Sequence, residues 1–139
     1  MRRPAIKQMD AMDCGPSCLA LVTRFLGRPV PVERFRELCG QSRTGVSLLG
    51  LSRAAEAVGL RSQGVRLNLP ALRKVTLPCI AHWHQNHFVV VWKIHKGRVW
   101  VGDPAHGGTV VYTEEEFLRH WGVADDAGET DPRGICLLL

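Results

Sequence analysis

The hydrophobic pattern of this chain changes once, from helical spacing in the first half to strand-like runs in the second. Three helices are predicted in the first half, over residues 13–25, 32–38 and 47–58. Asp13 and Ser47 stand where helix N-caps are expected, and glycines follow the first and third helices. Because helices come first and strands follow, the sequence predicts an α+β fold, with an N-terminal helical part packed on a C-terminal antiparallel sheet.

The second half contains short runs rich in valine, isoleucine and aromatic residues, which are typical of strands. One helix interrupts them, because Thr113 and Glu116 form a capping box that predicts a helix over 114–121. With 139 residues the chain is expected to form a single domain, 1–139. The predicted strands are 60–67, 77–83, 87–94, 98–103, 109–112 and 135–139.

Charge and cysteine content narrow the classes of partner and compartment. The net charge is +5, but the lysines and arginines are scattered, so ordinary solvated surface is expected, and nucleic acid or an anionic membrane is the weaker alternative. No signal peptide or membrane-spanning run is recognisable. The odd number of cysteines, five, favours free thiols in a reducing compartment. The apolar end, 135–139, indicates a final core strand of a chain that natively continues.

The segment around Cys14 combines a thiol with a predicted helix start. If Asp13 is the N-cap, Cys14 lies in the first turn, where unpaired N–H groups carry partial positive charge. This position stabilises the thiolate, which is the nucleophilic form of cysteine. Gly15 would leave room for a substrate backbone to approach. Cys18, one turn further along an apolar helix face, is expected to be a buried structural residue.

A hairpin in the second half offers a general base and a group to orient it. A three-residue loop over 95–97 would pair Trp92 with Trp100 across the hairpin. In that register His87 and Asp103 lie on one face, about 7–8 Å apart on diagonal positions. A two-residue loop would put them on opposite faces. Asp103 could also be a turn residue, since Asp-Pro is a strong turn signal.

Zinc binding is the alternative use of these side chains. Four ligands could come from Cys14, Cys18, His82, His84 and His87. However, the chain has no second cysteine pair and no standard zinc-site spacing, so neither a metal nor another cofactor is expected. His82 and His84 are instead interpreted as neighbours of the site or as lining a pocket.

The chain resembles the double-glycine leader peptidase domain of bacteriocin-processing ATP-driven transporters, a papain-like cysteine peptidase. The matching residues run through nearly the whole chain: Gln8, Asp13-Cys14-Gly15, Cys18-Leu19, Ile80 to Trp83, His87 to Val90, Asp103-Pro104 and Gly107. The resemblance implies a papain-like fold and four roles: Cys14 as nucleophile, His87 as general base, Asp103 as orienting group, and Gln8 in the oxyanion hole.

The resemblance also implies a substrate, a ribosomally made precursor peptide cut after a Gly-Gly or Gly-Ala pair. Trp83 and the loop that contains Asn86 are candidates to narrow the cleft around the glycines. An amphipathic leader helix, fused or associated membrane and ATP-binding domains, and a location on the cytoplasmic side of the bacterial inner membrane or in the cytoplasm are further expectations. The alternatives are a binding module without hydrolysis, and a cysteine-dependent transferase or other hydrolase.

Overall fold

The computed structural model describes residues 13–40, 46–83, 87–121 and 132–139. In these residues, no helix is long and apolar enough to cross a membrane. The described helices are α1 (Cys14–Phe25), α2 (Val32–Cys39), α3 (Leu48–Ala57), α4 (Leu69–Leu72) and α5 (Glu114–Trp121). The described strands are β1 (Gln63–Asn68), β2 (Cys79–Trp83), β3 (His87–His95), β4 (Arg98–Asp103), β5 (Gly108–Thr113) and β6 (Arg133–Leu138).

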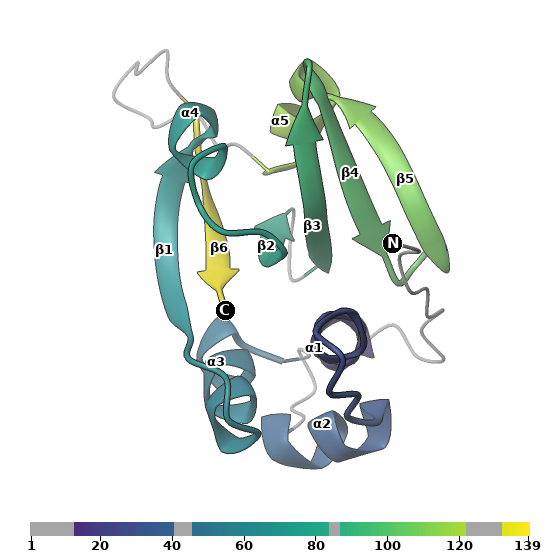
Figure 1. The fold of residues 1–139 in the computed structure, drawn as a ribbon. Helices are drawn as coiled ribbons and strands as arrows, with labels where there is room; N and C mark the ends of the chain where they lie inside the picture. Colours follow the sequence, from purple (N-terminus) through teal and green to yellow (C-terminus); the bar gives the residue numbers. More distant parts are fainter. Residues whose placement is uncertain (1–12, 41–45, 84–86, 122–131) are drawn as a thin grey trace.

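The strands form one antiparallel sheet with the order β1-β6-β2-β3-β4-β5. The helices α1, α2 and α3 gather together, and α4 and α5 lie apart from them (Figure 1). The last strand, β6, inserts between β1 and β2, so it joins the beginning of the sheet to its centre. The expected α+β architecture is therefore confirmed.

Successive side chains along the strands point to opposite faces of the sheet, and both faces are buried. Ile80 and Phe88 point into a cluster with α1, α2 and α3, whereas Ala81 and Val89 point into a second cluster with α4 and α5. A sheet covered on both faces has apolar residues at successive strand positions, which explains the continuous valine-rich run of β3. The two clusters fix the helices relative to the strands that carry the site.

Side-chain caps mark the starts of α3 and α5. Ser47 accepts a hydrogen bond from the backbone N–H of Gly50 at 3.0 Å, and Thr113 and Glu116 form the predicted reciprocal capping box. Asp13 is the N-cap of α1, as predicted, but its side chain makes no capping hydrogen bond to that helix. Its carboxylate instead pairs with Arg36 of α2 at 2.6 Å.

The helix α4 was not predicted. It has only four residues, too few for a hydrophobic period, and it follows β1 directly. Asn68 accepts a hydrogen bond from the backbone N–H of Ala71 at 2.9 Å, and Pro70 lies in the first turn, where a missing N–H costs nothing. The boundary of β1 also differs, because this strand begins at Gln63 and not at Leu60.

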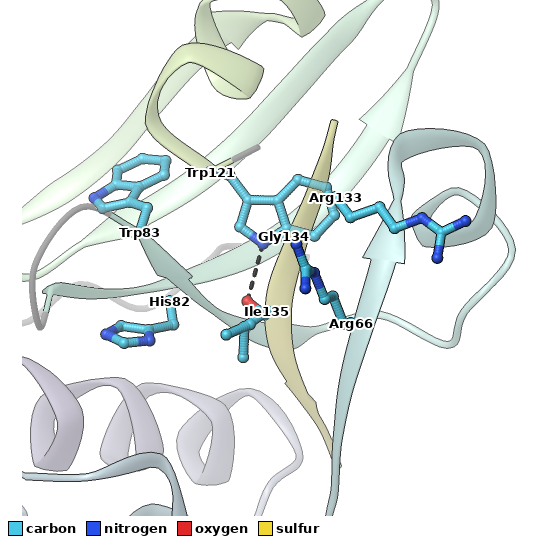
Figure 2. Close-up of a pocket in the computed structure, with 7 residues that line it drawn as sticks. All are labelled: Arg66, His82, Trp83, Trp121, Arg133, Gly134 and Ile135. Atoms are coloured by element: carbon cyan, nitrogen blue, oxygen red, sulfur yellow. Dashed lines mark hydrogen bonds between the residues drawn. The ribbon is translucent and has the colours of Figure 1, made fainter. Parts of the chain in front are cut away.

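Gly134 lies under the indole ring of Trp121, whose Nε1–H donates to the carbonyl of Ile135 at 2.9 Å (Figure 2). A methyl group on Gly134 would overlap that ring. We expect Gly134→Ala to lower the free energy of unfolding by about 1–3 kcal/mol, as overpacked cores do. Urea unfolding would measure this loss. Gly108→Ala is the control, because nothing lies within 4 Å of its added Cβ; equal stability of the two variants would contradict the prediction.

Candidate active site

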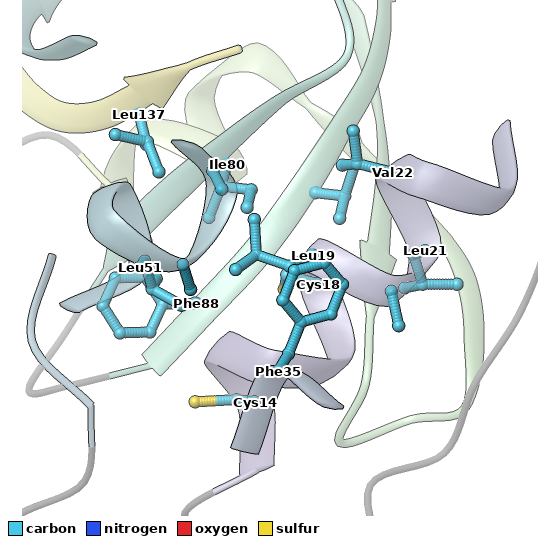
Figure 3. Close-up of a cluster of buried hydrophobic side chains, with 14 of the residues drawn as sticks. Cys14, Cys18, Leu19, Leu21, Val22, Phe35, Leu51, Ile80, Phe88 and Leu137 are labelled. Carbon is cyan, nitrogen blue, oxygen red and sulfur yellow. The ribbon is translucent and has the colours of Figure 1, made fainter. Parts of the chain in front are cut away.

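Cys14 is the first residue of α1 and lies at the border of the cluster between the helices and the sheet (Figure 3). Its side chain is buried, and the residue is 4% exposed. Packing constrains Gly15, because a Cβ there would lie 2.8 Å from Leu51 Cδ2 of α3, and the leucine side chain would have to shift. The expected role of Gly15 in admitting a substrate backbone is therefore not its only constraint. The close packing holds the start of α1 against α3.

An ion pair supports the same helix end. Arg36 on α2 contacts the carboxylate of Asp13 at 2.6 Å, and Asp13 is almost fully buried. A buried carboxylate requires such a partner, since charge is costly to bury alone. The pair fixes α2 against the residue that precedes Cys14. No local pattern indicates Arg36 as the partner of Asp13, because the two residues lie 23 positions apart.

The two ring nitrogens of His87 have different neighbours. Nε2 lies 2.9 Å from Oδ1 of Asp103, which leaves Nδ1 for the thiol side, and the His87 side chain also hydrogen-bonds Cys14. The described residues thus place the predicted nucleophile, base and orienting carboxylate in one chain of hydrogen bonds. A chain in which the base contacts the nucleophile and is itself held by a third group is the arrangement of nucleophilic catalysis.

The pKa values of the histidine and the carboxylate move in the directions that favour an ion pair. Burial alone would lower the pKa of His87, but the hydrogen bonds to Asp103 and Cys14 outweigh it and raise this pKa to about 9. Burial would raise the pKa of Asp103, yet the hydrogen bonds from His87 and from the backbone of Ala105 lower it overall. At neutral pH the site therefore contains an imidazolium ion beside a carboxylate.

Asp103 is both an orienting group and a turn residue. Its Oδ1 accepts a hydrogen bond from the backbone N–H of Ala105 at 2.9 Å, the pattern of an Asx turn, in addition to its contact with His87. His106 approaches the other oxygen at 3.8 Å. The backbone of the turn holds the Asp103 carboxylate in place, so the acceptor for His87 is already oriented.

The turn of the hairpin differs from the prediction. The loop has two residues, 96–97, and not the three of 95–97, and both have positive φ, as in a type I′ turn. The predicted pair of Trp92 with Trp100 is therefore wrong. Trp100 faces Lys93 instead, and the Lys93 Nζ lies 4.9 Å from the centroid of its ring.

An irregularity in β3 restores the register that the turn alone would have lost. The pairing shifts by one residue between Val91 and Lys93, which leaves Trp92 as a β-bulge, and Val91 then faces Val101. From this point the register is the predicted one, with His87 and Asp103 on the same face. The juxtaposition of His87 and Asp103 was thus predicted correctly from a loop length that was wrong.

Trp83 lies beside the histidine. It pairs with His87 across β2 and β3, with 6.2 Å between the ring centroids, and its indole also packs against Tyr112, His120 and Phe117. Only 4% of Trp83 is exposed, so this side chain forms a wall beside the base. Its contact with substrate remains a prediction. The other predicted contact residue, Asn86, and the predicted oxyanion donor, Gln8, lie outside the described residues.

His82, interpreted from sequence as a neighbour of the site, stacks on Phe88 with 4.5 Å between the ring centroids. Burial lowers its pKa, with a smaller contribution from nearby His87, so it is neutral at pH 7. His82 and Trp83 both line a cavity of about 320 Å³ (Figure 2). Within the described ranges, no group of three or more His, Cys, Asp or Glu side chains is placed to hold a metal ion; His84, one of the alternative zinc ligands, lies outside those ranges.

Several known proteins are similar to this chain in sequence. The Colicin V secretion/processing ATP-binding protein CvaB of Escherichia coli is 33% identical over 123 residues, which is 88% of this chain and 18% of that protein. The lactococcin-G-processing and transport ATP-binding protein LagD of Lactococcus lactis is 31% identical over 122 residues, 84% of this chain and 17% of that protein. The chain thus spans less than a fifth of the length of these relatives.

Solved structures agree with this similarity. A double glycine motif protease from an AMS/PCAT transporter, crystallised with the leader peptide, superposes with a TM-score of 0.84 at 38% identity, covering 99% of this chain and 90% of that one. The peptidase domain of Streptococcus ComA, at 22% identity and a TM-score of 0.81 over 99% of this chain and 97% of that one, shares the fold. The profile of the Peptidase C39 family matches residues 2–124, and the chain belongs to this family of cysteine peptidases.

Proposed function

We propose that this chain is a cysteine endopeptidase that removes the leader from a ribosomally made precursor peptide by cutting after a Gly-Gly or Gly-Ala pair. The observation that carries the proposal is the connected set of Cys14, His87 and Asp103, in which the base contacts both the thiol and the carboxylate. The similarity to a double glycine motif protease bound to a leader peptide supports the same substrate class.

In the proposed reaction each group has one role. The Cys14 thiolate attacks the carbonyl carbon of the second glycine, and the oxyanion forms near the backbone N–H of Cys14 at the start of α1. The imidazolium of His87 gives its proton to the leaving amine, which releases the mature peptide and leaves a thioester. Neutral His87 then takes a proton from water, the hydroxide attacks the thioester, and the leader leaves with a free carboxyl group while the Cys14 thiolate and the His87 imidazolium are restored. Asp103 holds the ring throughout.

The oxyanion and specificity contacts are proposed for Gln8, Trp83 and Asn86. The amide of Gln8 would be the second donor to the oxyanion. A narrow passage between Trp83 and the loop that contains Asn86 would admit glycine and exclude larger side chains. The burial of Trp83 supports a rigid wall on one side of that passage.

The relatives suggest the setting in which the domain acts. Their names describe secretion or transport, processing and ATP binding. The chain covers only 17–18% of their length. We propose that the domain works with transmembrane and ATP-binding domains, fused or separate, on the cytoplasmic side of the bacterial inner membrane. The amphipathic helix of the leader would bind outside the catalytic centre, in an apolar groove.

Cleavage of a synthetic precursor separates this proposal from its alternatives. A peptide with a Gly-Gly pair should yield two products whose masses place the cut after the second glycine, and a Val-Val twin should stay intact. Binding without products would favour the substrate-binding module, which the presence of Cys14, His87 and Asp103 argues against. Transfer of the acyl group to an added amine in preference to water would favour the transferase.

The pH dependence of cleavage is a direct test of the base. The pKa of His87 is raised to about 9, so the imidazolium persists at neutral pH and loses its proton as the pH rises through that value. We expect kcat/KM to fall along a basic limb near pH 9, because His87 is then neutral and cannot protonate the leaving amine. Rates measured between pH 6 and 10.5 would locate the limb. A limb near 6.5, the ordinary value for histidine, would contradict the coupling to Asp103 and Cys14.

A further inference from the structure

Part of the sheet face that packs against α1, α2 and α3 is exposed, where β4 and β5 form the edge of the sheet (Figure 1). Trp100 of β4 packs against the cluster with these helices and therefore marks this face. It is opposite Lys93 of β3 and Val111 of β5, so the three side chains form a row across the strands. The next row towards the hairpin turn is exposed as well and consists of His95, Arg98 and Thr113.

This open part of the face has an apolar centre. Val111, which flanks Trp100 on the neighbouring strand, is 43% exposed. Phe25, the last residue of α1, packs on Trp92 with 5.2 Å between the ring centroids, so the helix ends at the border of this surface. Leu26, the next residue, is 48% exposed. Exposed apolar side chains that gather at one place, unlike scattered ones, are typical of a binding surface.

Cations surround the apolar centre. Lys93 Nζ lies 4.9 Å from the centroid of the Trp100 ring, and Lys96 and Arg98 are exposed in and beside the hairpin turn. None of the three forms an ion pair within the described part of the chain. The acidic residues 114–116 begin α5, which packs on the opposite face of the sheet. We call this surface the basic face; it consists of Lys93, Lys96, Arg98, Trp100 and Val111.

The basic face lies far from the catalytic residues. His87 is the first residue of β3, and His95, beside the hairpin turn, is the last. A strand rises about 3.3 Å per residue, so the turn lies about 26 Å from the catalytic histidine. Asp103 is at the end of β4 that is remote from the turn as well. A partner bound to the basic face would therefore leave the catalytic end of the sheet accessible.

The chemistry of the basic face suits the surface of a lipid bilayer. Tryptophan and the stems of lysine and arginine are favourable at the level of lipid headgroups, where an apolar body meets a polar layer. Unpaired cations are complementary to the phosphates of anionic lipids. Single-stranded nucleic acid would also use the cations and the Trp100 ring, but it would gain little from the exposed aliphatic side chains of Val111 and Leu26.

We propose that the basic face docks on the surface of an anionic lipid bilayer, with its cations at the lipid phosphates and with Trp100 and Val111 among the headgroups. The inference goes beyond the proposed peptidase activity and does not depend on it. It gives the domain an orientation in which the hairpin turn faces the bilayer and the catalytic end faces away. Each basic side chain is expected to strengthen binding about fivefold, and salt is expected to weaken it.

Co-sedimentation with vesicles tests the proposal on the unsubstituted protein. One set of vesicles is phosphatidylcholine alone, and the other contains phosphatidylglycerol as about one third of the lipid. We expect the protein to sediment with the anionic vesicles only, and to be released in 0.5 M salt. Equal binding to both sets, or no binding to either, would overturn the inference.

Substitutions identify the surface that binds. The pair Lys93→Gln with Arg98→Gln is expected to lower the partition coefficient about 25-fold, and the exchange Lys93→Arg with Arg98→Lys to keep it. The matched control is Arg66→Gln with Arg133→Gln, which removes the same charge from exposed positions on β1 and β6 and is expected to keep binding. Val111→Thr should lower the partition coefficient about threefold through loss of apolar contact.

Two results from this series would contradict the proposed surface. An equal loss in the control pair would mean that net charge alone attracts the protein, and unchanged binding in the Lys93 and Arg98 pair would exclude the basic face. Circular dichroism would verify that each variant is folded. A single-stranded oligonucleotide that binds through the same two cations, with no effect of Val111→Thr, in a protein that ignores both sets of vesicles, would identify nucleic acid as the ligand and overturn the inference.

Discussion

Replacement of Cys14 by alanine is expected to abolish cleavage of a Gly-Gly precursor, with a loss of about 10⁵-fold or more in kcat/KM. Without the thiol no thioester forms, and the hydrogen-bond partner of His87 on the thiol side is lost. Peptide binding should survive, because the surfaces that hold the leader are unchanged. Product formation followed by mass spectrometry, together with Kd measurements, would check both expectations.

Cys18 is the matched control for this substitution. It lies one turn further along α1, is fully buried, and burial together with the nearby Cys14 and Asp103 raises its pKa well above the ordinary value for cysteine. Cys18→Ala is expected to lower stability by about 1 kcal/mol through a small cavity and to keep activity. Loss of turnover in a folded Cys18→Ala protein would contradict the structural assignment of this residue.

Asp103→Asn is expected to lower kcat/KM by about 10²-fold or more, while the domain stays folded. The amide oxygen can still accept from His87 and Ala105, so the substitution removes the negative charge and little of the geometry. The imidazolium loses its stabilising partner, and the basic limb of the pH profile should therefore move below pH 9.

Asp103→Ala separates charge from orientation, because it removes both. We expect it to be slower than Asp103→Asn, and its basic limb to lie at least as low. An unchanged rate in Asp103→Asn would exclude the charge from the mechanism, and an unchanged rate in both variants would exclude Asp103 altogether. Circular dichroism would verify that each variant is folded.

Local signals in the sequence predicted most of the fold. Caps such as Ser47 and the Thr113–Glu116 box locate helix starts through contacts within three residues, and strands such as β3 follow from β-branched runs. The short helix α4 was missed, because four residues carry no period. The position of β6 between β1 and β2 could not be predicted either, since strand order depends on packing between distant segments.

The candidate site was predictable where it follows from strand register and was missed where it depends on distant contacts. His87 and Asp103 meet through pairing of adjacent strands, which the sequence constrains. The ion pair of Asp13 with Arg36 and the burial of Trp83 beside His87 depend on how α2 and α5 pack, and no short-range pattern encodes these contacts.

The bulge at Trp92 has a consequence for how the β3–β4 hairpin can vary in length. As long as the turn keeps two residues, each residue gained or lost in one strand beyond it moves the following side chains to the other face of the sheet, and the bulge supplies one such reversal. The tip can therefore grow or shrink in steps of two without separating base from carboxylate. A single-residue change keeps His87 and Asp103 on one face only if the turn changes length, the bulge disappears or a second bulge forms, so the parity of this segment matters more than its length.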